Sequence, residues 1–289
     1  MYKRQDSEYA QNYTTCFLQD GDAFVLQTEF LMQILEGIHK YLPNIKHVTT
    51  YARADSIARK SVSELRELKT AGIEHLYCGM ETGSDLILRK INKGFDAATI
   101  IISGTKAKEA GMVLSEFTLF GIGGKELAEE NAVETAKVLN VIKPDFVRVH
   151  ATGIKLSSEM WNYVKNKELT LQSEEEIVSE QKIMLELLAD DMDCIYMNEH
   201  IVNLLLEVRG NIRTDKQNML ETINTYLQLP KQEQELFNLG RRLNIMFFLA
   251  DLNNRAKRKQ TEEGLRKIKT QNPDLDLAFV CNYVRQTQI

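Results

Sequence analysis

Short polar segments that end apolar runs carry the candidate chemistry of this 289-residue chain. In the first of them, the apolar run Cys16–Leu18 stops at Asp20-Gly21-Asp22, a turn with two carboxylates and one glycine. The pattern predicts a strand that delivers acidic groups to a loop. Because chemistry collects where parallel strands end at their carboxyl side, Asp20, Gly21 and Asp22 are candidate site residues.

Four more β-rich runs end in the same way, in polar or glycine-containing bends. Ile45–Tyr51 is followed by Ala52-Arg53-Ala54-Asp55, and Ile73–Cys78 by Gly79-Met80-Glu81-Thr82-Gly83-Ser84. Met112–Phe120 is followed by Gly121-Ile122-Gly123-Gly124, and Phe146–Ala151 by Thr152-Gly153. Glycine lets a backbone approach its neighbour closely, and we expect these bends to share a single rim.

The segments between the runs have helical periodicity, over residues 24–42, 61–71, 97–110 and 127–142. The second begins with Ser61 and Glu64, which have the spacing of a capping box. Strands that recur every 28 to 40 residues or so, with helices between them, have the βαβ rhythm of a parallel sheet or barrel. The first part of the chain is therefore predicted to be α/β.

The pattern changes after Lys155. Ser173 and Glu176 form a second capping-box pair at the start of a predicted helix. Helices are expected over 171–189, 201–208, 214–227, 230–239 and 255–270, with one more after Pro273 and a short strand at 194–197. We therefore divide the chain into an α/β domain, residues 1–165, and a mostly α-helical C-terminal domain, residues 166–289.

Composition limits the partners and the location that we expect. With 43% hydrophobic residues the chain can bury a sizeable core, and its formal net charge of −5 draws it toward neither nucleic acid nor an anionic membrane. No apolar run reaches the roughly 18 residues that span a bilayer. The basic segment 255–269 lacks interleaved aromatic residues, so we interpret it as a solvated helix face.

The cysteines make no CxxC-type pair. Cys16, Cys78, Cys194 and Cys281 lie far apart in the sequence. In a chain of this length, isolated cysteines indicate reduced thiols and a cytoplasmic location.

The amino terminus, Met1-Tyr2-Lys3-Arg4-Gln5, resembles the translation of a transposase adapter used in sequencing libraries. We interpret residues 1–5 as such an artefact rather than as a genuine polar tail, and exclude them from fold reasoning. The natural sequence is then expected to begin near Asp6, and the chain is expected to be a fragment of a longer protein.

Taken together, the strand-end bends resemble the successive motifs of the radical SAM superfamily. The carrying residues are Asp20-Gly21-Asp22, Tyr51-Ala52-Arg53-Ala54-Asp55, Gly79–Ser84 with Lys90-Ile91-Asn92-Lys93-Gly94, and Gly121–Gly124, in this order on consecutive strands. The resemblance is closest to the branch with Elp3-, MiaB- and coproporphyrinogen-dehydrogenase-like cores, and covers about residues 14–165. It implies a partial (βα)6 TIM-like barrel, here without its first βα unit, followed by the helical region.

The resemblance also implies cofactors and a reaction. Radical SAM proteins bind S-adenosylmethionine against a 4Fe-4S cluster, which reduces the sulfonium and releases a 5′-deoxyadenosyl radical that abstracts hydrogen from substrate. By position, Asp20, Gly21 and Asp22 would lie near the ammonium group of the nucleotide, and Arg53 would meet its carboxylate. Glu81 and Ser84 would face ribose or methionyl groups. Gly121, Ile122 and Gly123 would approach the adenine, which Thr152 would flank.

One departure from the superfamily pattern is large. The CxxxCxxC motif, whose thiolates hold the cluster, is absent, so we expect no metal ligands in this chain and expect the cluster only in a full-length parent. The chain as written is not expected to be active.

Several alternatives stay open. The chain is a nucleotide- or partner-binding remnant in one of them, and a cluster-free TIM-like lyase with a glutamate or histidine base in another. Asp20 and Asp22 also suit a helix-capping turn, and Arg53 also suits an ion pair with Asp55. His200 is either a structural hydrogen-bond donor or a catalytic residue that meets substrate. Neither the substrate nor the oligomeric state is predicted.

Overall fold

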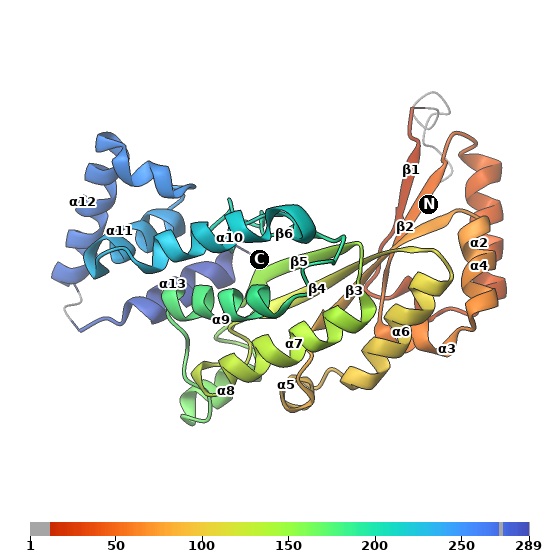
Figure 1. The fold of residues 1–289 in the computed structure, drawn as a ribbon, viewed down its shortest axis with the longest axis horizontal. Coiled ribbons are helices and arrows are strands. Elements are labelled where there is room, and N and C mark those ends of the chain that lie inside the picture. The colour runs from red at the N-terminus through yellow and green to blue at the C-terminus, as the bar shows by residue number, and fades with distance from the viewer. Residues whose placement is uncertain (1–11, 272–273, 289) are drawn as a thin grey trace.

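A seven-stranded sheet runs through the computed structural model, which describes residues 12–271 and 274–288 (Figure 1). The proposed artefact, residues 1–5, lies outside the described residues. The strands are β1 (Thr15–Leu18), β2 (His47–Ala52), β3 (Ile73–Glu81), β4 (Val113–Phe120), β5 (Phe146–Ala151), β6 (Ile195–Met197) and β7 (Gly210–Asn211). They pair in sequence order, parallel from β1 to β6, and only β7 is antiparallel to its neighbour. Consecutive parallel pairing is the order of a TIM-like barrel, which confirms the predicted α/β class.

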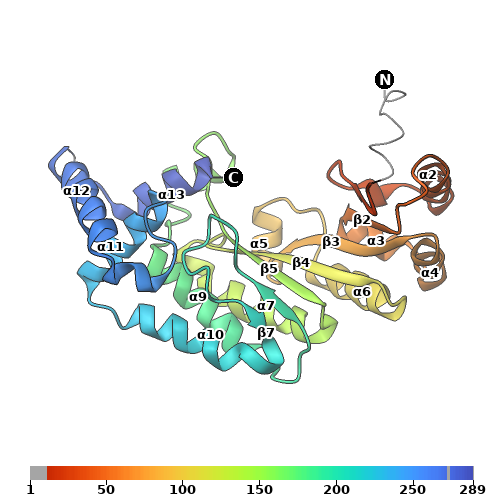
Figure 2. The same ribbon diagram turned by 90° about the horizontal axis from the view of Figure 1, so that it is seen from above.

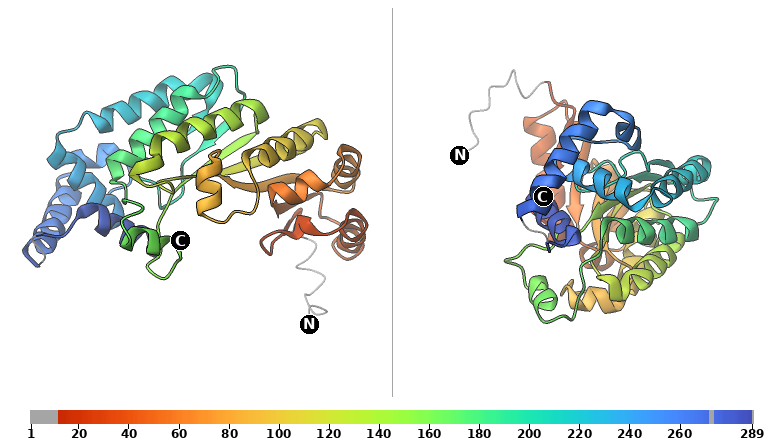
Figure 3. Two further views of the ribbon diagram at one scale, coloured as in Figure 1. Left: turned by 90° about the horizontal axis from the view of Figure 1, so that it is seen from below. Right: turned by 90° about the vertical axis from the view of Figure 1, so that its left-hand side faces the viewer.

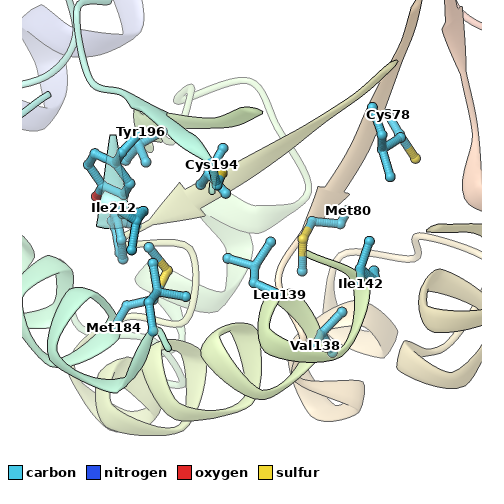
Figure 4. Packing of buried hydrophobic residues seen from close by; sticks show 14 of the residues in the cluster. Cys78, Met80, Val138, Leu139, Ile142, Met184, Cys194, Tyr196 and Ile212 are labelled. Carbon is cyan, nitrogen blue, oxygen red and sulfur yellow. The ribbon is translucent and has the colours of Figure 1, made fainter. Parts of the chain in front are cut away.

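Helices line one face of this sheet (Figures 2 and 3). They are α2 (Thr28–Tyr41), α3 (Ala54–Arg59), α4 (Val62–Thr70), α5 (Asp85–Lys90), α6 (Ala97–Glu109), α7 (Ala128–Ile142) and α9 (Glu174–Leu187). Alternate strand residues, including Val48, Leu76, Leu114 and Val147, are fully buried on this side. Figure 4 shows Leu139 of α7 between the helix layer and the sheet. The core therefore lies between the helices and one face of the sheet.

Both predicted capping boxes are present. The hydroxyl of Ser61 accepts from the Glu64 backbone N–H, and the Glu64 carboxylate accepts in return from the Ser61 N–H. Ser173 and Glu176 do the same at the start of α9. Each reciprocal pair satisfies two backbone donors that a helix start leaves free.

Three predicted elements have different bounds. The helix predicted over 24–42 is split into the 3-10 turn η1 (Ala23–Val25) and α2, because Leu26 and Gln27 are extended. Strand β3 continues past Cys78 to Glu81, with a register shift between Gly79 and Glu81. The bend predicted over 79–84 is therefore partly strand.

The helix predicted over 201–208 is wrong, since this segment forms a series of turns. The side chain of Asn203 accepts from the Ala151 N–H and donates to the Val149 carbonyl, and Asn198 donates to the Leu205 carbonyl. Hydrogen bonds between these side chains and backbone groups, near or far in the sequence, take the place of the backbone hydrogen bonds of a helix.

The chain after β5 is mostly helical. Its elements are α8 (Met160–Lys165), α9, α10 (Ile212–Leu227), α11 (Lys231–Arg242), η3 (Leu249–Asn253), α12 (Arg255–Gln271) and α13 (Leu277–Thr287). The division between residues 165 and 166 remains a prediction, and β6 extends the sheet beyond it by pairing with β5. None of the helices in the described ranges is long and apolar enough to cross a bilayer.

A buried ionic cluster joins three of these helices. The Glu174 carboxylate at the start of α9 accepts from Arg242 Nε at 2.7 Å and Nη2 at 2.8 Å, and from Arg285 Nη1 at 3.0 Å. All three side chains are at most 2% exposed. Burial alone would raise the pKa of Glu174, but the two arginines hold it at about 2.

Removing this carboxylate should destabilise the protein strongly, because two buried guanidinium groups would lose their counter-charge. We expect Glu174→Ala to lower the free energy of unfolding by about 3 to 5 kcal/mol, measured by urea unfolding. Glu134→Ala, which breaks an exposed pair with Lys137, is the matched control and should cost less than about 1 kcal/mol. Equal costs for the two variants would contradict a special role for Glu174.

Candidate functional site

The polar residues that follow β1 and β2 are in direct contact. The Asp22 carboxylate accepts from the Arg53 backbone N–H at 3.1 Å and from the Ser56 hydroxyl at 2.5 Å. It thereby fixes the start of α3 against the loop that leaves β1. Asp20 and Gly21, in the same loop, are exposed and have positive φ angles of 90° and 71°.

Arg53 connects this loop to the segment after α5. Its Nε donates to Asp55 Oδ1 at 3.0 Å, and its Nη2 donates to the Lys93 carbonyl at 2.8 Å. The guanidinium lies 5.1 Å from the centre of the Phe95 ring. The ion pair with Asp55, which the sequence left open, is therefore present, while Nη1 has no acceptor among residues 12–271 and 274–288.

Glu81 ends β3 and completes the line of contacts. Lys93 Nζ donates to Glu81 Oε1 at 2.7 Å, and both side chains are about one-fifth exposed. A side chain at Gly79 would overlap the Glu81 carboxylate, so this glycine leaves the space in which the pair forms. Asp22, Arg53 and Glu81 thus lie in one network across the ends of β1, β2 and β3.

The glycine turn after β4 is buried rather than open. Gly121, Ile122, Gly123 and Gly124 are all buried, and a Cβ at Gly123 would meet Ile87 of α5 at 2.9 Å. The Gly121 N–H donates to Glu180 of α9 at 3.0 Å. The adenine contact of this turn remains a prediction.

The Glu180 carboxylate accepts two further bonds, from Asn131 Nδ2 of α7 and from Gln172 Nε2. Burial raises its pKa to about 7, although the three N–H donors favour the ionised form. The carboxylate therefore fixes the turn to two helices and titrates near neutral pH.

Two more predicted residues have partners within the protein. Ser84 is fully buried, where its hydroxyl donates to Glu130 at 2.5 Å and accepts from the Ile87 N–H, so it caps α5. The Thr152 N–H donates to the Phe120 carbonyl at 2.8 Å, which places the end of β5 beside the end of β4. Their contacts with a nucleotide remain predictions.

His200 lies against another histidine. Its ring centre is 4.3 Å from that of His150, at the end of β5. Burial, His200 and Arg148 together lower the pKa of His150 to about 4, and burial lowers the pKa of His200. His150 is therefore neutral at ordinary pH, and the catalytic role of His200 stays a prediction.

One face of the sheet, which the helices leave uncovered, was not predicted from the sequence. Side chains at alternate strand positions meet there, from Phe17, Tyr51, His75, Tyr77, Phe117, Phe146 and Arg148. Aromatic residues that stand two positions apart on a strand, or at matched register on neighbouring strands, form the pattern of this face. In a small barrel such a pattern usually indicates side chains that fill the core, so it did not indicate an open face.

The cysteines do not fit an iron–sulfur cluster. Cys78, Cys194 and Cys281 are buried on β3, before β6 and in α13, and Cys16 is half-buried on β1. Burial raises the pKa of all four thiols, whereas cluster ligands are thiolates. Across the part of the chain that the structure describes, no three His, Cys, Asp or Glu side chains are grouped to hold a metal ion.

The chain is similar in part to known proteins. No family model matches it. It is 24% identical to the heme chaperone HemW of Bacillus subtilis over 173 residues, a match that covers 59% of this chain and 45% of the relative. The chain therefore spans about half the length of that relative.

Two similar solved structures are the Escherichia coli coproporphyrinogen III oxidase HemN, described as a radical SAM enzyme, and an amino-terminally truncated Elp3 of Methanocaldococcus infernus. HemN has a TM-score of 0.49 and 14% identity, over 63% of this chain and 47% of its own. Elp3 has a TM-score of 0.48 and 14% identity, over 61% and 45%. The strand-end motifs predict a resemblance to the radical SAM superfamily, and HemN carries that description.

Two glycines near Glu81 should respond differently to an added methyl group. A Cβ at Gly83 would overlap the backbone of Glu134 and Thr135, so Gly83→Ala should lower the free energy of unfolding by about 1 to 3 kcal/mol. A Cβ at Gly79 meets only the ends of the Glu81 and Lys93 side chains, which can move. Gly79→Ala should therefore cost less than about 1 kcal/mol in urea unfolding, and a larger cost than that of Gly83→Ala would contradict this geometry.

The pKa of Glu180 predicts a pH-dependent stability. The carboxyl pKa of Glu180 is raised from 4.5 to about 7 in the folded protein. The protonated group therefore stabilises the fold fully below about pH 4.5, and this stabilisation is lost as the pH rises through about 7. Wild-type protein should therefore lose about 2 to 3 kcal/mol of unfolding free energy between pH 5 and pH 8 relative to Glu180→Gln. Urea unfolding across this range measures the difference, and parallel pH profiles would contradict the prediction.

Proposed function

Since the chain resembles the radical SAM superfamily, we propose that it binds S-adenosylmethionine at the strand-end rim formed by Asp20–Asp22, Arg53 and Glu81. In this proposal it is part of a radical SAM protein whose cluster ligands lie outside these 289 residues. Reductive cleavage of the ligand is proposed only for such a longer parent, acting on an unknown substrate.

One observation carries the proposal: groups of opposite charge at the rim, Arg53 and Glu81, are connected through Lys93 and keep unused hydrogen-bonding atoms. Arg53 Nη1 has no acceptor, and Glu81 Oε2 has no donor, within the described ranges. The two side chains are connected through Lys93, whose carbonyl binds Arg53 and whose ammonium binds Glu81. A zwitterionic amino-acid end, such as the methionyl group of S-adenosylmethionine, needs a donor fork for its carboxylate and an acceptor for its ammonium.

The neighbouring residues hold these groups in place. Asp22 binds the Arg53 backbone, and Asp55 binds its Nε, so the guanidinium is oriented before a ligand arrives. The exposed Asp20 carboxylate adds negative charge at the same rim. Preorganised charge of this kind reduces the side-chain entropy that the protein loses when a ligand binds.

The cysteines among the described residues do not fit a 4Fe-4S cluster. In radical SAM proteins the cluster supplies the electron for the sulfonium, and this proposal assigns no part of that step to residues of this chain. The alternative of a binding protein without catalysis is favoured by the burial of Cys78, Cys194 and Cys281, which raises the pKa of each thiol.

Calorimetric titration of the 289-residue protein with S-adenosylmethionine tests the proposal. Wild-type protein should bind, and Arg53→Ala and Glu81→Ala should each weaken the affinity by about tenfold or more, which is about 1.4 kcal/mol. Arg66→Ala and Glu67→Ala, exposed on α4, are matched controls and should leave it unchanged. No wild-type binding, or wild-type affinity in both rim variants, would overturn the proposal.

The same protein separates binding from cleavage. After treatment with iron, sulfide and a reductant, this chain should leave S-adenosylmethionine intact, because its thiols do not form a cluster site. Formation of 5′-deoxyadenosine would contradict that inference while leaving the binding proposal in place.

A further inference from the structure

A cavity of about 1060 Å³ lies in the helical part of the chain, among α8, the start of α9, α11 and the segment that leads into α13. Helices α11, α12 and α13 gather at the end of the molecule opposite α2 and α4 (Figures 1 and 2). None of the rim residues Asp22, Arg53 and Glu81 lines the cavity. Its volume is that of a site for a small organic molecule.

Aromatic and aliphatic side chains make up the apolar part of the lining. Trp161 of α8 and Phe279 of α13 are both half-buried there, and their ring centres are 6.1 Å apart. Val164 and the fully buried Leu169 add aliphatic surface. The faces of such rings attract organic cations as well as apolar groups.

Most charged groups of the lining are already paired. Three of its four lysines bind carboxylates at 2.7 to 3.0 Å, in the pairs Lys125–Glu176, Lys231–Glu175 and Lys269–Glu235. Glu174, also in the lining, is bound by Arg242 and Arg285. The electrostatic preference of the cavity therefore depends on the groups that have no counter-ion.

Two aspartates and one lysine of the lining have no counter-ion within residues 12–271 and 274–288. They are Asp274 and Asp276, which precede α13, and Lys167, which follows α8. Asp276 Oδ1 accepts from the Ala278 N–H at 2.9 Å and caps α13, and this bond leaves its formal charge without a cation. Two carboxylates against one ammonium leave negative charge in excess, and Asp276 is only three residues from the ring of Phe279.

We propose that this cavity binds an organic ammonium with an apolar body. The cationic head lies between the Trp161 and Phe279 rings and the two free aspartates, and the body packs against Val164 and Leu169. An organic anion would meet a single unpaired ammonium and two unpaired carboxylates that repel it. The site shares no residue with the strand-end rim and so goes beyond the proposed binding of S-adenosylmethionine.

The fluorescence of Trp161 tests the proposal, because this residue is the only tryptophan of the chain. The probes are 4-phenylbutylammonium, 4-phenylbutan-1-ol and 4-phenylbutyrate, which share a ring and a four-carbon chain and differ in charge. Wild-type protein should bind the ammonium about tenfold or more tighter than the carboxylate, with the alcohol between them.

A double variant, Asp274→Asn with Asp276→Asn, should abolish this preference and leave the affinity for the alcohol unchanged. Asparagine at 276 still caps the helix, so the variant removes charge and keeps the fold. Asp96→Asn is the matched control, since Asp96 caps α6 by accepting from the Thr99 N–H and lies outside the cavity. It should keep the wild-type preference.

Removing the indole should affect the cation more than the alcohol. Calorimetry of Trp161→Leu should show an affinity for the ammonium that falls about two- to fivefold more than that for the alcohol, because only the cation loses a cation–π contact. An equal loss for the two probes would contradict the contact on which the proposal depends.

Absence of saturable binding to wild-type protein, equal or reversed affinities for ammonium and carboxylate, or a preference that survives in the double variant would overturn the proposal. If the double variant does not fold by circular dichroism, the wild-type order of affinities and the two single asparagine variants decide the question. The assay contains no S-adenosylmethionine, so its failure would leave the rim proposal standing. Failure of the rim variants would equally leave this site untouched.

Discussion

Two buried carboxylates on α9 connect the end of the sheet to the helices that follow it. Glu180 binds the Gly121 N–H after β4 and Asn131 of α7, while Glu174 binds Arg242 of α11 and Arg285 of α13. A buried carboxylate is costly unless its partners are complete, so each one fixes the positions of several elements at once. The glycine turn after β4 is consequently fixed by a carboxylate that lies 59 residues away in the sequence.

The two faces of the sheet have different chemistry. The helix-covered face is mostly apolar, but it also carries Thr50 of β2 and Glu116 and Thr118 of β4. Burial raises the carboxyl pKa of Glu116 well above its ordinary value. The other face carries rings and Arg148 from the same strands at alternating positions. Parallel sheets are usually covered on both sides, and the uncovered side here is the one that carries the aromatic rings. The strand-end rim and the uncovered face thus belong to one sheet but present different chemical groups.

Local signals in the sequence were enough to predict most of the fold. The βα rhythm located β1 to β5, a short apolar run located β6, and two capping boxes located the starts of α4 and α9. Long-range bonds account for the errors, since Asn203 keeps 201–208 out of a helix by binding β5. The rim was predicted because the carboxyl ends of parallel strands lie at the same edge of a sheet. The sequence could not show which atoms of Arg53 and Glu81 have no hydrogen-bond partner. The burial of the glycine turn depends on Glu180, 59 residues away, and the open face was hidden because alternating aromatics resemble barrel core.

The docking of α13 has a consequence for how the protein is made. Asn282 both accepts from the Ile154 N–H and donates to the Ile154 carbonyl, across 128 residues, and Gln286 accepts from the Leu156 N–H. These bonds tie the segment after β5 to α13, which follows it by more than a hundred residues. Contacts of such long separation form late. During synthesis, a chain that has completed its strands must therefore wait for α13, and the polar backbone after β5 stays hydrated until that helix has left the ribosome.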